Sequence, residues 1–142
     1  MRSKDGNPNS YNASDAVNSL KWGERASEAL TVAYYKGVIA VRKAHPAFRM
    51  NTPAQIKANV KFLNAPDDIL AYSINGKAVK DTWSTIVVIS NPNSSAKKVT
   101  LPAVGNWIVS VQGDKAGVAT LATLKNVKVA TVPANSTMVL HK

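Results

Sequence analysis

A polar segment near the start of the sequence holds the side chains best suited to bind a ligand. It carries amides, hydroxyls and one carboxylate at Asn7, Asn9, Ser10, Tyr11, Asp15 and Asn18. Tyr11 and Trp22 add flat aromatic faces. Sugars need donors and acceptors for their hydroxyls and an aromatic plate for their C–H faces, so this set suits a carbohydrate. Asn-rich segments also commonly stabilise turns, and both interpretations stay open from the residues alone.

Groups that could perform catalysis are scarce in this chain. It holds 8 acidic residues, 2 histidines and no cysteine, which excludes thiol catalysis and disulfide bonds. Glu24 and Glu28 lie at the exposed start of an expected helix, where acidic side chains suit the helix dipole. The sequence has no Ser/His/Asp order, phosphate-binding loop or dinucleotide-binding glycine pattern. We therefore expect no catalytic residues in the chain by itself.

The remaining candidate ligands for a metal also favour structural roles. Asp67 and Asp68 are adjacent, whereas a calcium loop of the EF-hand type needs alternating Asp or Asn and a distal Glu. We interpret this pair as part of a turn. His45 precedes Pro46, where a capping role at a helix end is expected, and His141 is close to the end of the sequence. We expect no metal site and no cofactor here, and leave open whether a longer parent protein holds calcium.

The charge balance makes nucleic acid the first partner to test. The formal net charge is +10 and the isoelectric point is about 10.0. The basic residues do not cluster, however, because the adjacent basic pairs are only Arg42-Lys43 and Lys97-Lys98. No helix-turn-helix pattern, aromatic RNA-binding strand or zinc-finger spacing accompanies them. We therefore expect solvated surface lysines and no nucleic-acid partner.

One helix must position the end of the polar segment. Leu30, Tyr34, Val38 and Val41 recur at helical spacing after Ser27, which is a good N-cap residue. Pro46 prevents the helix from continuing. The spacing predicts an amphipathic helix that ends at His45-Pro46, with its apolar face covered by the domain that follows. No apolar run is long enough to span a bilayer, so we expect no membrane segment.

After the helix, the period of the apolar residues changes to that of strands. We expect strands at Ile56–Leu63, Ile69–Asn75, Thr85–Ser90, Lys97–Leu101, Trp107–Gln112, Val118–Leu124, Val127–Val132 and Thr137–His141. Turn signals such as Asn75-Gly76 and Gly113-Asp114 separate them. The unbroken apolar run from Ile86 to Ile89 predicts a central strand that is buried on both faces. About eight short strands at this spacing indicate a mainly β fold, an antiparallel sandwich.

Several motifs of the chain resemble those of type I pullulanases. Arg2-Ser3-Lys4, Gly6 to Tyr11, and Asp15 to Asn18 resemble elements from the end of the catalytic domain of these enzymes. The segment His45-Pro46-Ala47-Phe48-Arg49 resembles the end of the last helix of their barrel. Gly105-Asn106-Trp107 and Val132 to Ser136 are similar to the β-sandwich that follows the barrel. Type I pullulanases are α-1,6-glucan debranching glycoside hydrolases of the α-amylase superfamily.

The resemblance implies a C-terminal fragment of such an enzyme. Residues 1–49 would be the terminal loop and last helix of an incomplete (β/α)8 barrel, and residues 50–142 the sandwich. The sandwich would stabilise the barrel, and the fragment alone is not expected to be catalytic. The implied substrate-binding residues are Arg2, Asn9, Tyr11, Asp15 and Asn18. They would contact an α-glucan such as pullulan, amylopectin or limit dextrin.

The resemblance leaves the compartment of this chain open. A parent enzyme is expected to be a monomer secreted by a bacterium, with its signal peptide outside this sequence. The first alternative function is a stand-alone carbohydrate-binding module, in which the sandwich holds α-glucan through Trp83, Trp107 or Tyr72. A tryptophan at a strand end is also commonly a core residue, so exposure decides between these roles. The second alternative, a nucleic-acid binder, rests on charge alone.

Overall fold

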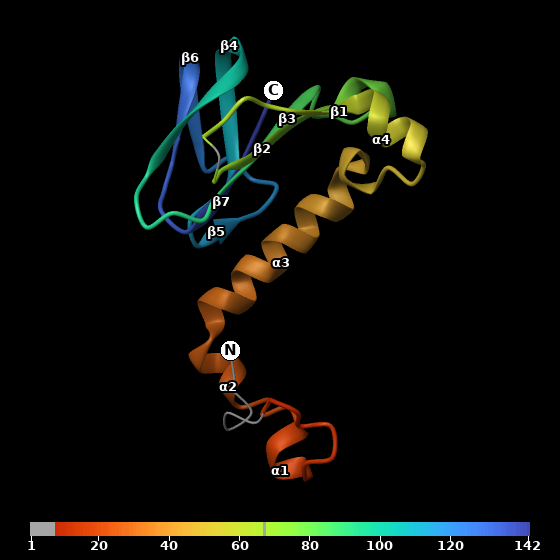
Figure 1. Cartoon of the computed structure of the whole chain (residues 1–142), viewed down its shortest axis with the longest axis vertical. Coiled ribbons are helices and arrows are strands. Elements are labelled where there is room, and N and C mark those ends of the chain that lie inside the picture. The colour runs from red at the N-terminus through yellow and green to blue at the C-terminus, as the bar shows by residue number, and fades with distance from the viewer. Residues whose placement is uncertain (1–7, 67) are drawn as a thin grey trace.

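The computed structural model describes residues 8–66 and 68–142 (Figure 1). The helices are α1 (Asp15–Asn18), α2 (Glu24–Ser27), α3 (Ala29–Ala44) and α4 (Pro53–Asn59), with short 3-10 helices η2 (Pro46–Arg49) and η3 (Gly76–Val79). The strands are β1 (Val60–Phe62), β2 (Leu70–Asn75), β3 (Thr85–Asn91), β4 (Lys97–Gln112), β5 (Lys115–Ala116), β6 (Ala122–Val132) and β7 (Ser136–His141). Figure 1 shows the strands gathered in one β domain, from which α3 extends toward α1 and α2.

The strands form an antiparallel arrangement in which the last one is central. Neighbouring strands follow the order β1-β2-β3-β7-β4-β5, and β6 pairs with β4. All of these pairs are antiparallel. β7 therefore lies between β3 and β4, which precede it in the chain. The predicted mainly β, antiparallel fold is confirmed, with seven strands in the described residues.

The longest strand, β4, was predicted as two separate strands. Its pairing with β6 shifts register between Thr100 and Gly105, and again between Gly105 and Trp107. Pro102 lies in the first of these intervals, where its missing N–H interrupts no ladder. Bulges of this kind let one strand continue through a bend. The first part of β4 and the end of β6 share one apolar core with β3.

Two apolar cores lie on opposite faces of the central strands. The first is the interior between the sheet and the β4–β6 ribbon, and it includes Val87, Ile89, Val99, Trp107 and Leu140. The second lies between the sheet and the α3–η2 segment, and it includes Val41, Trp83, Ile86, Val88 and Val139. Alternate residues of β3 thus enter opposite cores, which confirms the prediction of a strand buried on both faces.

The helix α3 contacts the β domain with less of its apolar face than predicted. Gly37 and Val41 are its buried residues, and Tyr34 is partly buried. Gly37 allows a close approach, because an added Cβ would lie 1.9 Å from the carbonyl oxygen of Ala116 in β5. Leu30 and Val38 are exposed, so the prediction that the β domain covers them is wrong. Figure 1 shows that the N-terminal half of α3, to which Leu30 belongs, extends beyond the strands.

Two element boundaries also differ from the sequence prediction. The strand predicted from Ile56 begins only at Val60, because residues 53–59 form α4. Thr52 caps that helix by accepting a hydrogen bond from the Gln55 backbone N–H at 3.2 Å. Ser27 is not the cap of the long helix, since it ends α2 and Glu28 precedes α3.

Among the described residues, no helix is both long and apolar enough to cross a membrane.

Candidate functional site

The N-terminal polar segment is folded around the side chain of Asn18. Its Nδ2 donates hydrogen bonds to the carbonyl oxygens of Ser10 at 2.7 Å and Ala13 at 3.0 Å. Asn18 itself is fixed because it ends α1, whose Ser19 N–H bonds back to the Asp15 carbonyl at 2.8 Å. The segment from residue 10 to residue 18 is therefore a closed loop with a defined shape.

The structure places four of the five predicted substrate-binding residues in or beside this loop. The Asn9 Oδ1 accepts a long hydrogen bond of 3.4 Å from the Tyr11 backbone N–H. The Tyr11 side chain is 93% exposed, and Asp15 is exposed in the first turn of α1. Asn18 supports the loop through its amide, a role that the sequence analysis did not assign to it. The predicted role of Arg2 falls outside the described residues.

A concave surface adjoins the loop where it runs into α2 and α3. Its volume is about 670 Å³. The lining residues are Val17, Asn18, Ser19, Leu20, Lys21, Trp22, Glu24, Arg25, Val32 and Lys36. Trp22 is 75% exposed, so an aromatic face, cations and an acid are accessible together. This set of groups can bind a polar ligand with apolar faces, such as a sugar.

The described residues offer this segment no catalytic or metal centre. They contain no cluster of three or more His, Cys, Asp or Glu side chains that could hold a metal ion. Glu24 and Glu28 lie around α2, and both are exposed. Asp15 has no second carboxylate near it along α1.

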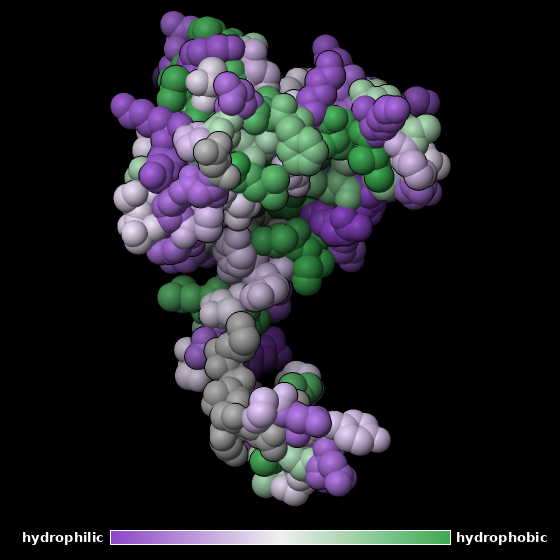
Figure 2. Space-filling model, viewed as in Figure 1, coloured by the Kyte–Doolittle hydropathy of each residue, from purple (hydrophilic) through white to green (hydrophobic). Residues whose placement is uncertain are grey.

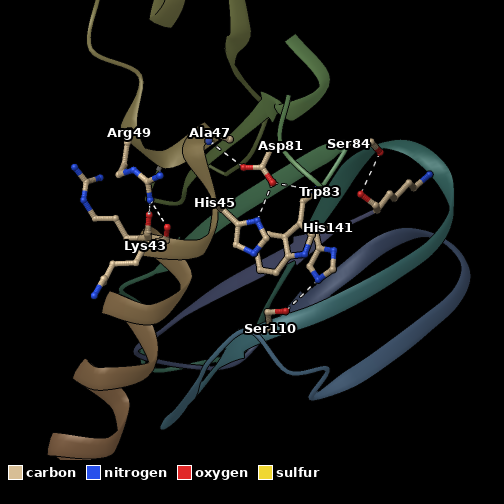
Figure 3. Close-up of polar contacts among 11 residues, drawn as sticks. Lys43, His45, Ala47, Arg49, Asp81, Trp83, Ser84, Ser110 and His141 are labelled. Carbon is tan, nitrogen blue, oxygen red and sulfur yellow. Dashed lines mark hydrogen bonds and ion pairs between the residues drawn. The ribbon is translucent and has the colours of Figure 1, made fainter. Parts of the chain in front are cut away.

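A second polar cluster joins the end of α3 to the β domain, and the sequence analysis missed it (Figure 3). Asp81 is buried and accepts three hydrogen bonds. They come from His45 Nδ1 at 2.7 Å, the Ala47 N–H at 3.0 Å and the Trp83 N–H at 2.9 Å. Burial opposes ionisation of this carboxyl, but the three hydrogen bonds and the His45 charge outweigh it, so the pKa of Asp81 is lowered.

Three aromatic rings stack beside this carboxylate. The Trp83 indole lies between two imidazoles, with centroid distances of 3.4 Å to His45 and 3.7 Å to His141. The interplanar angles are 22° and 7°. His141 Nε2 is 3.1 Å from the Ser110 hydroxyl. His45 is the C-cap residue of α3, as predicted, but its side chain turns to Asp81. The Arg49 guanidinium donates instead to the Arg42 and Lys43 carbonyls at the end of the helix.

Comparison with known proteins identifies the β domain. A family model described as the pullulanase all-beta domain matches residues 56–115. These residues, which are less than half of the chain, are therefore similar to the pullulanase all-beta domain. The chain is also 35% identical to a pullulanase of Bacillus subtilis strain 168 over 102 residues, covering 72% of this chain and 14% of that protein. The chain therefore spans only a small part of the length of this relative.

Solved structures extend the similarity beyond the pullulanase all-beta domain to nearly the whole chain. A pullulanase from Bacillus acidopullulyticus superimposes with a TM-score of 0.90 at 39% identity, covering 98% of this chain and 17% of its own. The type I pullulanase of Bacillus subtilis strain 168, complexed with maltose, gives 0.87 at 28% identity, covering 99% and 19%. The predicted resemblance to type I pullulanases is confirmed.

The exposure of the aromatic rings decides whether the β domain can hold α-glucan through Trp83, Trp107 or Tyr72. Trp107 is completely buried in the first core, and Trp83 is buried in the second. The Trp107 Nε1 donates to the Ala103 carbonyl at 3.2 Å, which satisfies its polar atom internally. Neither ring is accessible to a sugar, so both are core residues. Tyr72 is half-buried on the face toward α3, where burial raises its pKa.

Proposed function

We propose that this chain works as the C-terminal part of a pullulanase-type enzyme that cleaves α-1,6 bonds in α-glucans such as pullulan and amylopectin. In this proposal, residues 1–49 complete a catalytic barrel and residues 50–142 form the β domain that stabilises it. The catalytic acids would come from the preceding part of the enzyme. The chain alone binds part of the substrate and does not hydrolyse it.

The observation that carries the proposal is the set of exposed apolar side chains on α3. Leu30 is 74% exposed, Tyr35 65% and Ile39 56%. Figure 2 shows hydrophobic residues at the surface along α3. A helix that is buried at Gly37 and Val41 yet exposes large side chains elsewhere needs a second surface to cover them. The relatives are several times longer than this chain, and a barrel within them is the surface we propose.

We assign the glucan contacts to the N-terminal loop, specifically to Asn9, Tyr11, Asp15, Asn18 and Arg2. The exposure of Tyr11 and Asp15 supports this assignment, because their side chains are accessible to a ligand. A solved relative holds maltose, which is a fragment of an α-glucan. Tyr11 would supply the flat face, and the Asp15 carboxylate and the amides would bond sugar hydroxyls.

A chimera tests this function. This chain replaces the corresponding segment of the Bacillus acidopullulyticus pullulanase, to which it is 39% identical. We expect the chimera to release reducing ends from pullulan, while the isolated chain releases none. A folded chimera without activity, or an isolated chain that hydrolyses pullulan, would contradict the proposal.

Single substitutions in the active chimera then test the glucan contacts. Tyr11→Ala and Asp15→Asn should each raise KM for pullulan, with a loss on the order of 1–3 kcal/mol of binding per contact. Asn12→Ala is the matched control, because Asn12 is exposed in the same loop and is assigned no contact. If all three variants show the same KM, the loop does not bind the glucan.

The other partner predictions are separate from this test. We propose an α-glucan as the ligand of a monomer that binds neither nucleic acid nor membrane. The described basic side chains are distributed over helices and strands, which supports the part of the proposal that concerns nucleic acid. Retention of duplex DNA at physiological salt would overturn that part.

A further inference from the structure

The stack of His45, Trp83 and His141 joins three distant parts of the chain (Figure 3). His45 links α3 to η2, Trp83 follows η3, and His141 ends the central strand β7. All three residues are buried. With the hydrogen bonds to Asp81, this column of rings fastens the end of α3 to the β domain. The attachment therefore depends on the rings of two histidines.

The surroundings of His141 suit its neutral form. Its Nε2 lies 3.1 Å from the Ser110 hydroxyl, whereas its buried Nδ1 has no hydrogen-bond partner. With the proton on Nε2, the ring donates to Ser110 and leaves only a lone pair unpaired at Nδ1. Protonation would place an N–H at Nδ1 in a buried position that offers it no acceptor. An unpaired buried donor is costly, and an unpaired buried charge is more so.

The neighbouring elements provide little to offset such a charge. Across the sheet, His141 pairs with Ile86 of β3 and Ile108 of β4, which are both apolar. The pKa of His141 is accordingly lowered from 6.5 to about 4, mainly because the ring is buried. The charge of His45 contributes in the same direction, and that of Asp81 acts in the opposite direction. Lys142, the next residue along the chain, places its Nζ over the Trp107 ring, 4.5 Å from the ring centroid.

We infer that this column is an acid-sensitive latch, in which neutral His141 holds the end of α3 on the β domain and protonation of His141 releases it. A released His141 takes up a proton near its ordinary pKa of 6.5, whereas the held one resists until about pH 4. Between these values, acid favours the released form. The equilibrium constant for release should rise about tenfold per pH unit in that window. Above a pH of 6.5, the latch stays closed.

Nuclear magnetic resonance on the full 142-residue chain gives the first test. The chain has only 2 histidines, so their ring signals can be assigned by substituting one of them. We expect His141 to remain neutral, with its proton on Nε2, throughout the range in which an exposed histidine titrates. A His141 ring that titrates near 6.5 in the folded chain would refute the latch.

Amide exchange distinguishes release of α3 from unfolding of the whole domain. The amides of Ala47 and Trp83 donate to Asp81, so they report on the latch, whereas those of Val87 and Ile89 report on the core strand β3. From about pH 7 to about pH 4.5, the opening constants of the first pair should rise more than tenfold, after correction for intrinsic exchange. An unchanged first pair, or an equal rise in both pairs, would overturn the proposal.

Two variants separate the titration of His141 from its packing. His141→Gln keeps a donor near the Ser110 hydroxyl but cannot titrate, so its opening constants should lose their acid dependence. Ser110→Ala is the matched control, because it removes the hydrogen bond and leaves the imidazole in place. It should open more at every pH and keep the acid dependence. An acid dependence that survives in His141→Gln assigns the effect to another group, and the ring titration decides the matter if a variant fails to fold.

Discussion

At the scale of single residues, Asn18 shows how one side chain can serve the shape of a site and its chemistry. The resemblance to type I pullulanases implied that Asn18 contacts the glucan, and its amide suits a sugar hydroxyl. In the folded chain, its Nδ2 holds the carbonyls of Ser10 and Ala13, so its first effect is on the loop that presents Tyr11. Local composition reveals which groups are present, but it does not reveal which of them bond the backbone.

Asn18→Ala should therefore open the loop without unfolding the β domain. The variant loses two hydrogen bonds, each worth about 1 kcal/mol. The Ala13 amide, which bonds to the Ser10 carbonyl at 3.0 Å, should exchange on the order of tenfold faster. Hydrogen exchange measures this, with Asn12→Ala as the control. Unchanged protection of Ala13 would mean that other contacts hold the loop.

At the scale of elements, most strands could be predicted, whereas the ends and junctions could not. The Ile86–Ile89 run was predictive because only a strand with two covered faces is apolar throughout. The helix α4 was missed although Thr52-Pro53 is a good cap and first turn, because its weak apolar pattern also fitted a strand. Asp81 and His45 are 36 residues apart, so no local pattern could bring them together.

The contact between α3 and β5 also joins residues that are far apart in the sequence, and it depends on Gly37 having no side chain. Gly37→Ala should displace the helix from Ala116, because the new Cβ would overlap the Ala116 carbonyl oxygen. We expect a loss of about 1–3 kcal/mol in the free energy of unfolding, despite the higher helix propensity of alanine. Denaturant unfolding measures it. Gly23→Ala is the control, because its Cβ would meet nothing within 4 Å, and equal stability of the two variants would disprove the close contact.

At the scale of the whole molecule, α3 has one side that packs against the β domain and another that exposes apolar side chains to solvent. Its buried side holds the β domain through Gly37 and Val41, and its exposed apolar side matches our proposal of a barrel partner. The two sides can be separated experimentally because they involve different residues. The similarity to a pullulanase structure over 98% of this chain explains why the sequence motifs within residues 1–49 were informative.

The double variant Leu30→Lys, Ile39→Lys tests two exposed apolar side chains of α3. In the isolated chain both side chains are largely in solvent, so the free energy of unfolding should change by less than about 0.5 kcal/mol. In the chimera with the Bacillus acidopullulyticus enzyme, the same change should lower the melting temperature or abolish activity, because charges would be buried. If the two lysines change neither the melting temperature nor the activity of the chimera, no barrel covers these two positions.

The central position of β7 has a consequence for biosynthesis. β3 and β4 both pair with this strand, yet residues 136–141 leave the ribosome after all the other strands. Until then, the two strands that flank β7 present open edges, which can pair wrongly with other chains. Closure of the β domain must therefore wait until β7 has been synthesised. A cell that makes this protein has to keep the nascent chain from aggregating until β7 is inserted.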